Sequence, residues 1–214
     1  MRLLVGLALL IAAAFAPAQH GHQPMHPRFE DAERWAPVFE DPARDAWQKP
    51  DDVIRALALP ATARVADIGA ATGYFSVRLA RALPQGRVYG VDIEPDMTRY
   101  LRERAAREGL SNLVAHAGAP DDPRLPERVD LVLVVNAYHH IAARSAYFAR
   151  LKPALTAGGR VAVIDFRLDS PVGPPRRHRV APETVQEEMR AAGYRLAERH
   201  EFLPHQFFLV FAPV

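Results

Sequence analysis

The chain has 214 residues, of which 49% are apolar, so it is about the length of one domain and can bury a substantial core. Its 27 basic and 25 acidic residues leave a net charge of +2, which predicts neither a nucleic-acid-binding surface nor a polybasic membrane patch. The absence of cysteine excludes disulfides, thiolate metal sites, cysteine nucleophiles and a lipid-modified cysteine anchor.

The first eighteen residues have the pattern of an export signal. Arg2 precedes an apolar and small-residue run from Leu3 to Ala14, and Ala16-Pro17-Ala18 supplies the small residues that a signal peptidase needs. This run is shorter than the roughly 20 apolar residues that span a bilayer. We expect cleavage after Ala18, a periplasmic or secreted protein, and no stable membrane insertion afterwards. The alternatives are an uncleaved anchor, or a cytoplasmic protein that starts at Met25.

Residues 19–50 are predicted to form a partly helical extension ahead of the main domain, residues 51–214. Trp35, Phe39 and Trp47 interrupt charged sequence here. The simpler expectation is that these rings pack the extension onto the domain, and the alternative is a lid over a ligand pocket. We predict no metal site, because three nearby histidines lie on a Pro-containing tail without fixed geometry: His20, His22 and His26.

From residue 51 onward, strand and helix patterns alternate. The predicted elements are helix 51–59, strand 64–68, helix 74–83, strand 87–93, helix 96–108, strand 113–116, strand 129–135, helix 143–155, strand 160–166, helix 182–192 and strands 194–202 and 206–211. Gly158-Gly159 is expected to end helix 143–155. The continuous apolar run 129–135 is typical of a strand buried on both faces. The alternation predicts an α/β fold, a doubly wound, Rossmann-like, mainly parallel sheet that ends in an antiparallel hairpin.

The loop after the first predicted strand is rich in glycine. Gly69 and Gly73 follow that strand and precede a helix, where glycines let the backbone turn tightly and approach a ligand at the helix N-terminus. Asp92 closes the next strand nineteen residues after Gly73, where a carboxylate can accept both hydroxyls of a ribose. Either a dinucleotide or S-adenosylmethionine fits this arrangement.

Two departures from the dinucleotide pattern favour S-adenosylmethionine. Asp67 lies two residues before Gly69, where its charge would repel a diphosphate and attract an ammonium and a sulfonium group. Ala71 occupies the place of the middle glycine that admits a pyrophosphate. The pattern therefore predicts a ligand with ribose and adenine but without a diphosphate.

These residues resemble a known family. The segments DIGAATGYFSVRLA and VYGVDIEPDM look like motifs one and two of class I S-adenosylmethionine-dependent methyltransferases, and LKPALTAGGRVAVIDF resembles the segment leading into their fifth strand. The order of elements from Asp51 to Val214 is similar to their seven-stranded sheet with its antiparallel hairpin. Within the family, the segment with Asn136, His139 and His140 resembles a segment of quinone-biosynthesis-like small-molecule methyltransferases. Ala71 and a lengthened Lys-Pro-Gly-Gly turn depart from the family pattern.

The resemblance implies a cofactor site for S-adenosyl-L-methionine. Asp67, Gly69, Ala71 and Gly73 would line the methionine end, Asp92 would hold the ribose, and Ile93 would lie against the adenine. Either Asp121 or Asp122 would accept a hydrogen bond from the adenine amino group, and the resemblance does not choose between them. Local alternatives are simple turn glycines at 69 and 73 and a helix-capping role for Asp92.

The catalytic candidates follow the fourth predicted strand, because ligands bind outside the carboxyl ends of parallel strands. Asn136 can orient the substrate or the cofactor, and a neutral imidazole at His139 or His140 can accept a proton. The alternative is that one histidine caps the next helix and the other packs beneath it. Asp165, at the end of strand 160–166, either contacts the substrate or has only a structural role as a capping residue.

The leading functional hypothesis is an enzyme that methylates a small molecule, acting as a monomer or homodimer. The alternatives are a non-catalytic module that binds S-adenosylmethionine or a protein partner and, more remotely, an NAD-dependent oxidoreductase. No acceptor-recognition motif is visible. An export signal also conflicts with a cofactor that is made in the cytoplasm.

Overall fold

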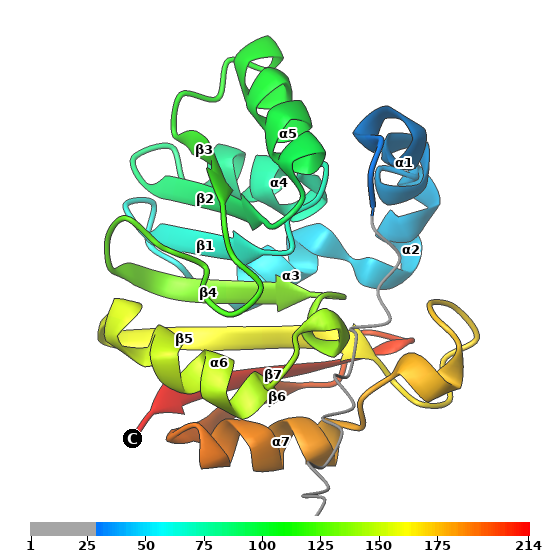
Figure 1. The fold of residues 1–214 in the computed structure, drawn as a ribbon, viewed down its shortest axis with the longest axis vertical. Helices are drawn as coiled ribbons and strands as arrows, with labels where there is room; N and C mark the ends of the chain where they lie inside the picture. Colours follow the sequence, from blue (N-terminus) through cyan, green and yellow to red (C-terminus); the bar gives the residue numbers. More distant parts are fainter. Residues whose placement is uncertain (1–28) are drawn as a thin grey trace, which may run out of the picture.

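The computed structural model describes residues 29–214 (Figure 1). The predicted export signal and the three histidines of the N-terminal tail lie outside the described residues. Within residues 29–214, no helix combines the length and the apolar character needed to cross a bilayer.

The described chain alternates between helices and strands after a short helical N-terminal segment. The strands are β1 (Arg64–Ile68), β2 (Arg87–Asp92), β3 (Leu113–Ala117), β4 (Val129–Val135), β5 (Leu155–Phe166), β6 (Tyr194–His200) and β7 (Gln206–Pro213). The α-helices are α1 (Ala32–Phe39), α2 (Asp45–Gln48), α3 (Pro50–Ala56), α4 (Tyr74–Ala82), α5 (Pro95–Arg107), α6 (Arg144–Leu151) and α7 (Pro182–Ala191). Single 3-10 turns are η1 (Pro42–Arg44), η2 (Tyr138–His140), η3 (Lys152–Ala154) and η4 (Arg176–His178).

Most predicted boundaries agree with the structure to within a few residues, but the predicted end of helix 143–155 is wrong. Helix α6 ends at Leu151, and Pro153 in the following turn cannot supply the N–H that a continued helix needs. Strand β5 begins at Leu155, which pairs with Val129 of β4. Gly158-Gly159 therefore lies within β5, where the pairing with β4 shifts register.

Seven strands of the described chain form one sheet in the order β3-β2-β1-β4-β5-β7-β6. Strands β1 to β5 are parallel, and β7 runs antiparallel to both β5 and β6. This arrangement confirms the predicted doubly wound sheet with its C-terminal hairpin. The strand order reverses between β1 and β4, which is where ligands bind in open α/β sheets.

Both faces of the sheet are covered by helices (Figure 1). On one face, Leu131 and Leu133 of β4 pack in a core with residues of α3, α4 and α5. On the other face, Val132 and Val134 pack in a second core with residues of α6 and α7. All four side chains are fully buried, which explains why β4 reads as a continuous apolar run.

The aromatic residues of the C-terminal hairpin belong to these cores. Phe208 lies in the first core, and Phe207 and Phe211 lie in the second, because successive residues of a strand face opposite sides. Phe202, between β6 and β7, is only partly buried and packs against the first core.

Candidate active site

The candidate site lies at the sheet edge where β1, β2, β4 and β5 end. The loop after β1 and the segment after β4 touch at the point where the strand order reverses. A methyl group in place of a hydrogen of Gly69 would lie 2.5 Å from the Ala137 side chain, so this close approach requires glycine. The contact brings the predicted cofactor loop against the predicted catalytic segment.

The loop from Gly69 to Gly73 contains three left-handed residues. Gly69 (φ 74°), Ala71 (φ 47°) and Gly73 (φ 98°) alternate with ordinary residues, and the first two amides of the loop donate to the carbonyl of Val91. Ala71 adopts this conformation although it is not glycine, at a cost of roughly 1–2 kcal/mol. The departure from the family pattern at Ala71 thus keeps a glycine-like backbone conformation.

Asp92 connects the end of β2 to this loop. One carboxylate oxygen accepts the Ala71 amide at 2.8 Å, and the other accepts the Glu94 amide at 3.0 Å. Burial raises the pKa of this carboxyl, and the backbone hydrogen bonds oppose that rise. Each oxygen accepts one of these amide protons and has a further lone pair, as binding of ribose hydroxyls requires.

The side chain that follows Asp92 is unusually exposed for an apolar residue. Ile93 is 56% exposed, although it directly follows a buried strand. An adenine ring lying against it would cover this apolar surface. Ile93 and the lone pairs of Asp92 therefore fit a nucleoside cofactor at this place.

Asp67 lies beneath the glycine loop, with 3% of its surface exposed. It accepts a hydrogen bond from the Ser76 hydroxyl of α4 at 2.6 Å. Burial raises the pKa of Asp67 to about 6, the Ser76 hydrogen bond opposes the rise, and the charge of Asp92 adds to it. The role of Asp67 at the methionine end stays a prediction, and from its buried position its charge would act on a ligand through a medium of low polarity.

The two aspartates proposed for the adenine amino group have different surroundings. Asp122 accepts the Arg124 amide at 2.7 Å and so closes a local turn. The side chain of Asp121 is 74% exposed and lies 3.8 Å from Arg150, which also binds the Asp121 carbonyl. Gly118, just before them, donates its amide to the carbonyl of Asp92, so the segment lies beside the predicted ribose site. The choice between the two carboxylates stays a prediction.

The catalytic segment after β4 contains a buried histidine–aspartate pair. Nδ1 of His139 lies 3.0 and 2.9 Å from the two carboxylate oxygens of Asp165, at the end of β5. The side chains are 5% and 1% exposed, respectively. The carboxylate also accepts the Phe166 amide at 2.8 Å, and the His139 amide lies 3.3 Å away. A buried carboxylate that faces Nδ1 holds the proton there, so Nε2 has the free lone pair.

The other two catalytic candidates have different environments. Asn136 has a left-handed backbone (φ 55°), and its side-chain oxygen accepts a hydrogen bond from Gln206 at 2.6 Å. With that oxygen occupied, the amide NH₂ of Asn136 is the group left to donate. The ring of His140 lies 4.1 Å from the ring of His139 and packs against Phe29. His139 thus has a buried carboxylate partner in Asp165, and the choice of base between the two histidines stays a prediction.

An additional contact to the glycine loop comes from the N-terminal segment. Glu40 accepts the Thr72 hydroxyl at 2.6 Å and forms a 2.6 Å ion pair with Arg104 of α5. Thr72 is fully buried inside the predicted cofactor loop. No local sequence pattern predicts this contact, because Glu40 and Thr72 are thirty-two positions apart in the chain.

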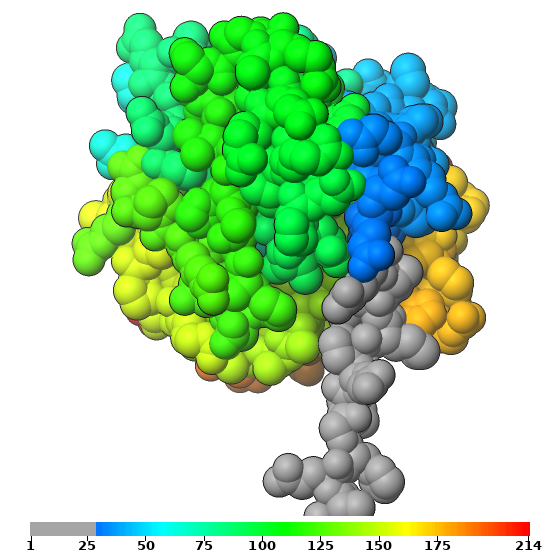
Figure 2. Space-filling model, turned by 45° about the horizontal axis from the view of Figure 1, so that its top comes forward, coloured from blue at the N-terminus to red at the C-terminus, as the bar shows by residue number. Residues whose placement is uncertain are grey.

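The same segment lies along α5 (Figure 2). The Ala32 amide donates to Asp96 at 2.6 Å, and Glu33 pairs with Arg99 at 2.8 Å. Together with Glu40, these contacts fix residues 29–48 across the edge of the sheet next to the cofactor loop.

A single arginine makes most of the hydrogen bonds within the basic loop that follows β5. The Arg179 guanidinium donates to five backbone carbonyls of the loop: Arg167, Leu168, Ser170, Pro174 and Val172. The arginine therefore folds the loop around itself, while Arg176 and Arg177 in η4 remain exposed.

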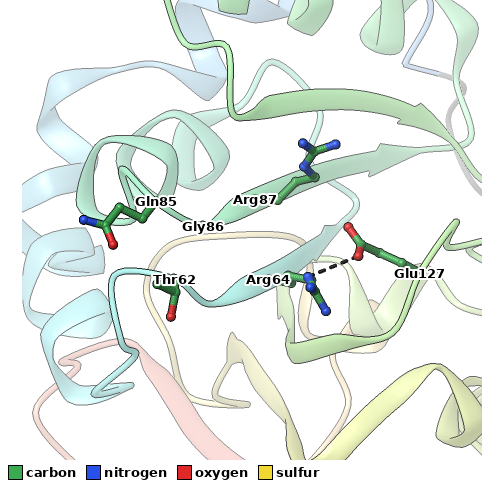
Figure 3. A pocket seen from close by; sticks show the side chains of 6 residues that line it. All are labelled: Thr62, Arg64, Gln85, Gly86, Arg87 and Glu127. Atoms are coloured by element: carbon green, nitrogen blue, oxygen red, sulfur yellow. Dashed lines mark ion pairs between the residues drawn. The ribbon is translucent and has the colours of Figure 1, made fainter.

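One hollow in the surface lies at the other end of the sheet. It has a volume of about 530 Å³ and contains the ion pair between Arg64 and Glu127 at 3.1 Å (Figure 3). Arg64 and Arg87, which both line it, are the first residues of β1 and β2. Because the candidate site follows the last residues of these strands, this hollow is separate from it.

Comparison with known proteins identifies a methyltransferase family. The model of a family described as a methyltransferase domain matches residues 60–203. A trans-aconitate 2-methyltransferase of Rhodopseudomonas palustris is 32% identical over 66% of this chain and 52% of its own length. A ubiquinone/menaquinone biosynthesis C-methyltransferase UbiE of Cupriavidus taiwanensis is 31% identical over 48% of this chain and 43% of its own length. The chain thus spans about half the length of these curated relatives.

A solved structure shows the same fold over nearly its whole length. A SAM-dependent methyltransferase from Aquifex aeolicus superposes with a TM-score of 0.79 and 22% identity, covering 86% of this chain and 99% of that one. The doubly wound sheet with its antiparallel hairpin is therefore shared with a protein of that activity.

Replacing Asp92 tests the ribose assignment. We expect Asp92→Ala to weaken binding of S-adenosylmethionine and of its demethylated product by about 2 kcal/mol or more, since a charged hydrogen-bond acceptor is lost. Titration calorimetry measures this change. Glu103→Ala, which removes a half-exposed carboxylate from α5, is the matched control and should leave the affinity unchanged. Unchanged affinity in a folded Asp92→Ala protein would show the assignment to be wrong.

The pKa of Asp67 predicts a pH dependence of cofactor binding. A cation binds best above pH 6, where Asp67 is ionised, so the affinity should fall up to about tenfold from pH 7 to pH 5. Asp67→Asn should lower the affinity at pH 7 and remove this dependence. Calorimetry at several pH values measures both effects, and an equally pH-dependent variant would contradict the role of Asp67.

The Asp67→Asn variant also tests whether Asp67 acts in cofactor binding or stabilises the fold. A carboxyl whose pKa is raised on folding stabilises the protein below its unfolded-state pKa, near 3.8, and loses that contribution as the pH rises through about 6. Asp67→Asn should therefore unfold at the same or a higher temperature than the native chain at pH 7. A large drop in melting temperature would identify Asp67 as a structural residue.

Proposed function

Because this chain belongs to the class I S-adenosylmethionine-dependent methyltransferase family, we propose that it transfers a methyl group to a neutral, proton-bearing group of a small molecule, most simply a hydroxyl. The His139–Asp165 pair supports this proposal. An acceptor that is already an anion needs no base, whereas a hydroxyl must lose a proton as its oxygen attacks.

Asp67, the glycine loop, Asp92 and Ile93 would hold the cofactor. When bound, the cofactor supplies a methyl group on a positively charged sulfur. Asp67 and Asp92 are two acids without a cationic partner among the described residues, so this pocket favours a cation and disfavours a diphosphate. These residues fit S-adenosylmethionine and argue against a nicotinamide dinucleotide.

The acceptor would be activated by residues after β4. Nε2 of His139 takes the hydroxyl proton while the acceptor oxygen forms its bond to the methyl carbon. Asp165 keeps the imidazole in the required tautomer and stabilises the imidazolium that results. The NH₂ group of Asn136 donates to the acceptor oxygen or to the cofactor, with its orientation set by Gln206.

Removing the base tests this assignment. We expect His139→Gln to lower the methyl-transfer rate by about 10²–10⁴-fold while leaving the affinity for the demethylated product unchanged, since base catalysis contributes that much. The rate is measured with S-adenosylmethionine labelled in its methyl group and a panel of hydroxyl compounds. A variant with the native rate would rule out His139 as the base.

The tautomer gives a second readout that needs no acceptor. Long-range nitrogen NMR of the native chain should show His139 protonated on Nδ1, and Asp165→Asn should change that state. A native His139 protonated only on Nε2 would contradict the orientation on which the proposal depends.

For the location of the protein, we propose export directed by residues 1–18, followed by action as a monomer or homodimer outside the cytoplasm. The supporting observation is the apolar run with small residues before Ala18. Mass spectrometry of the native protein should find Gln19 as the first residue. A soluble protein that retains residues 1–18, or one that starts at Met25, would contradict export.

A further inference from the structure

Three aromatic rings of the N-terminal segment form a cluster that contacts His140 through Phe29. Trp35 and Phe39 of α1 stack with centroids 5.6 Å apart and an interplanar angle of 14°. Phe29 packs edge-on against both, at 5.1 and 5.6 Å. We call Phe29, Trp35 and Phe39 the aromatic wall.

The wall is not part of the interior. None of its rings belongs to either apolar core of the sheet, and all three are partly exposed. Its segment is held instead by polar contacts, from Asp96, Arg99 and Arg104 of α5 and from Thr72. Polar contacts therefore hold the segment on α5 and on the glycine loop, and Phe29 of the wall adds one ring contact to His140 of the domain.

Trp47 shows the contrast within the same segment. Its ring lies 5.8 Å from Phe166 and 6.3 Å from His205, residues of the domain at the edge of β5 and β7. The sequence left two expectations open for these aromatic residues, packing and a lid. All four rings are partly exposed, so their contacts make the difference: Trp47 packs on two rings of the domain, whereas the rings of the wall pack on one another and reach the domain through Phe29, beside the proposed base.

The wall is continuous with the proposed base. Phe29 contacts His140 edge-on at 5.9 Å, and the ring of His140 lies 4.1 Å from that of His139. At the Phe29 end of the wall, the ring of His140 alone separates the wall from the ring of His139. Aromatic rings attract other rings through offset and edge-to-face contacts, in addition to the area that they bury.

We propose that the aromatic wall binds the body of the acceptor, and that the acceptor is an uncharged, planar aromatic compound with a hydroxyl group. This inference rests on the proposed function, because the hydroxyl is required by the base. The planar body is required by the wall. Methyl transfer to such a molecule joins the methyl carbon to the hydroxyl oxygen, breaks the bond from carbon to sulfur, and moves the hydroxyl proton to His139.

A binding experiment tests the wall separately from catalysis. The full chain is saturated with S-adenosylhomocysteine, the demethylated product, and titrated calorimetrically with 1-naphthol or with decahydro-1-naphthol, a saturated alcohol of similar size. We expect 1-naphthol to bind at least about tenfold more tightly. Equal binding of the two probes, or no binding of 1-naphthol, would overturn the proposal.

Matched substitutions then locate the binding. Trp35→Leu keeps apolar bulk but removes the ring, and should weaken 1-naphthol binding about tenfold, as expected for a lost aromatic contact. Trp35→Phe keeps a ring and should stay within about threefold of the native affinity. Trp47→Leu, the control in the same segment, should leave the affinity unchanged. An equal loss in Trp47→Leu, or no loss in Trp35→Leu, would overturn the proposal.

Binding of S-adenosylhomocysteine separates this inference from the proposed function. All three variants should keep the native affinity for it, because no residue of the wall lies in the cofactor loop. A native chain that does not bind it would refute the proposed function itself. A chain that binds it and ignores 1-naphthol would refute only the acceptor class.

Discussion

The site depends on the close approach of the glycine loop to the segment after β4. Gly69 has no side chain, so its backbone can lie where a methyl group would be 2.5 Å from Ala137. This contact brings the loop after β1 against the segment after β4, at the point where the strand order reverses. As a result, the carboxylates of the cofactor side and the histidine of the catalytic side share one edge.

Three buried or half-buried carboxylates at this edge differ in their partners. Asp165 faces an imidazole, whereas Asp67 has a hydroxyl and Asp92 has two backbone amides. Neutral partners compensate a buried charge only in part, and accordingly burial raises the pKa of both Asp67 and Asp92. The proposed cofactor side therefore favours a positively charged ligand, whereas on the proposed catalytic side the carboxylate of Asp165 faces the ring of His139.

The N-terminal segment connects the two sides. Its acidic residues attach to α5 and to the buried Thr72, and its aromatic wall lies next to His140. A segment attached by polar contacts can present apolar rings to a ligand without placing them in the core. Its position links the cofactor loop, through Glu40, to the surface proposed for the acceptor.

The sequence by itself determined the sheet, its hairpin, the glycine loop and the placing of Asp92 at the end of β2, because strand and helix periodicity and turn chemistry are local properties. Only the tertiary structure decided which side chains meet: His139 with Asp165, Asn136 with Gln206, and Glu40 with Thr72. It also buried Asp67 beneath the loop and moved the start of β5 to Leu155. These pairings join residues 26 to 70 positions apart, and they depend on strand order and register, which local patterns do not encode.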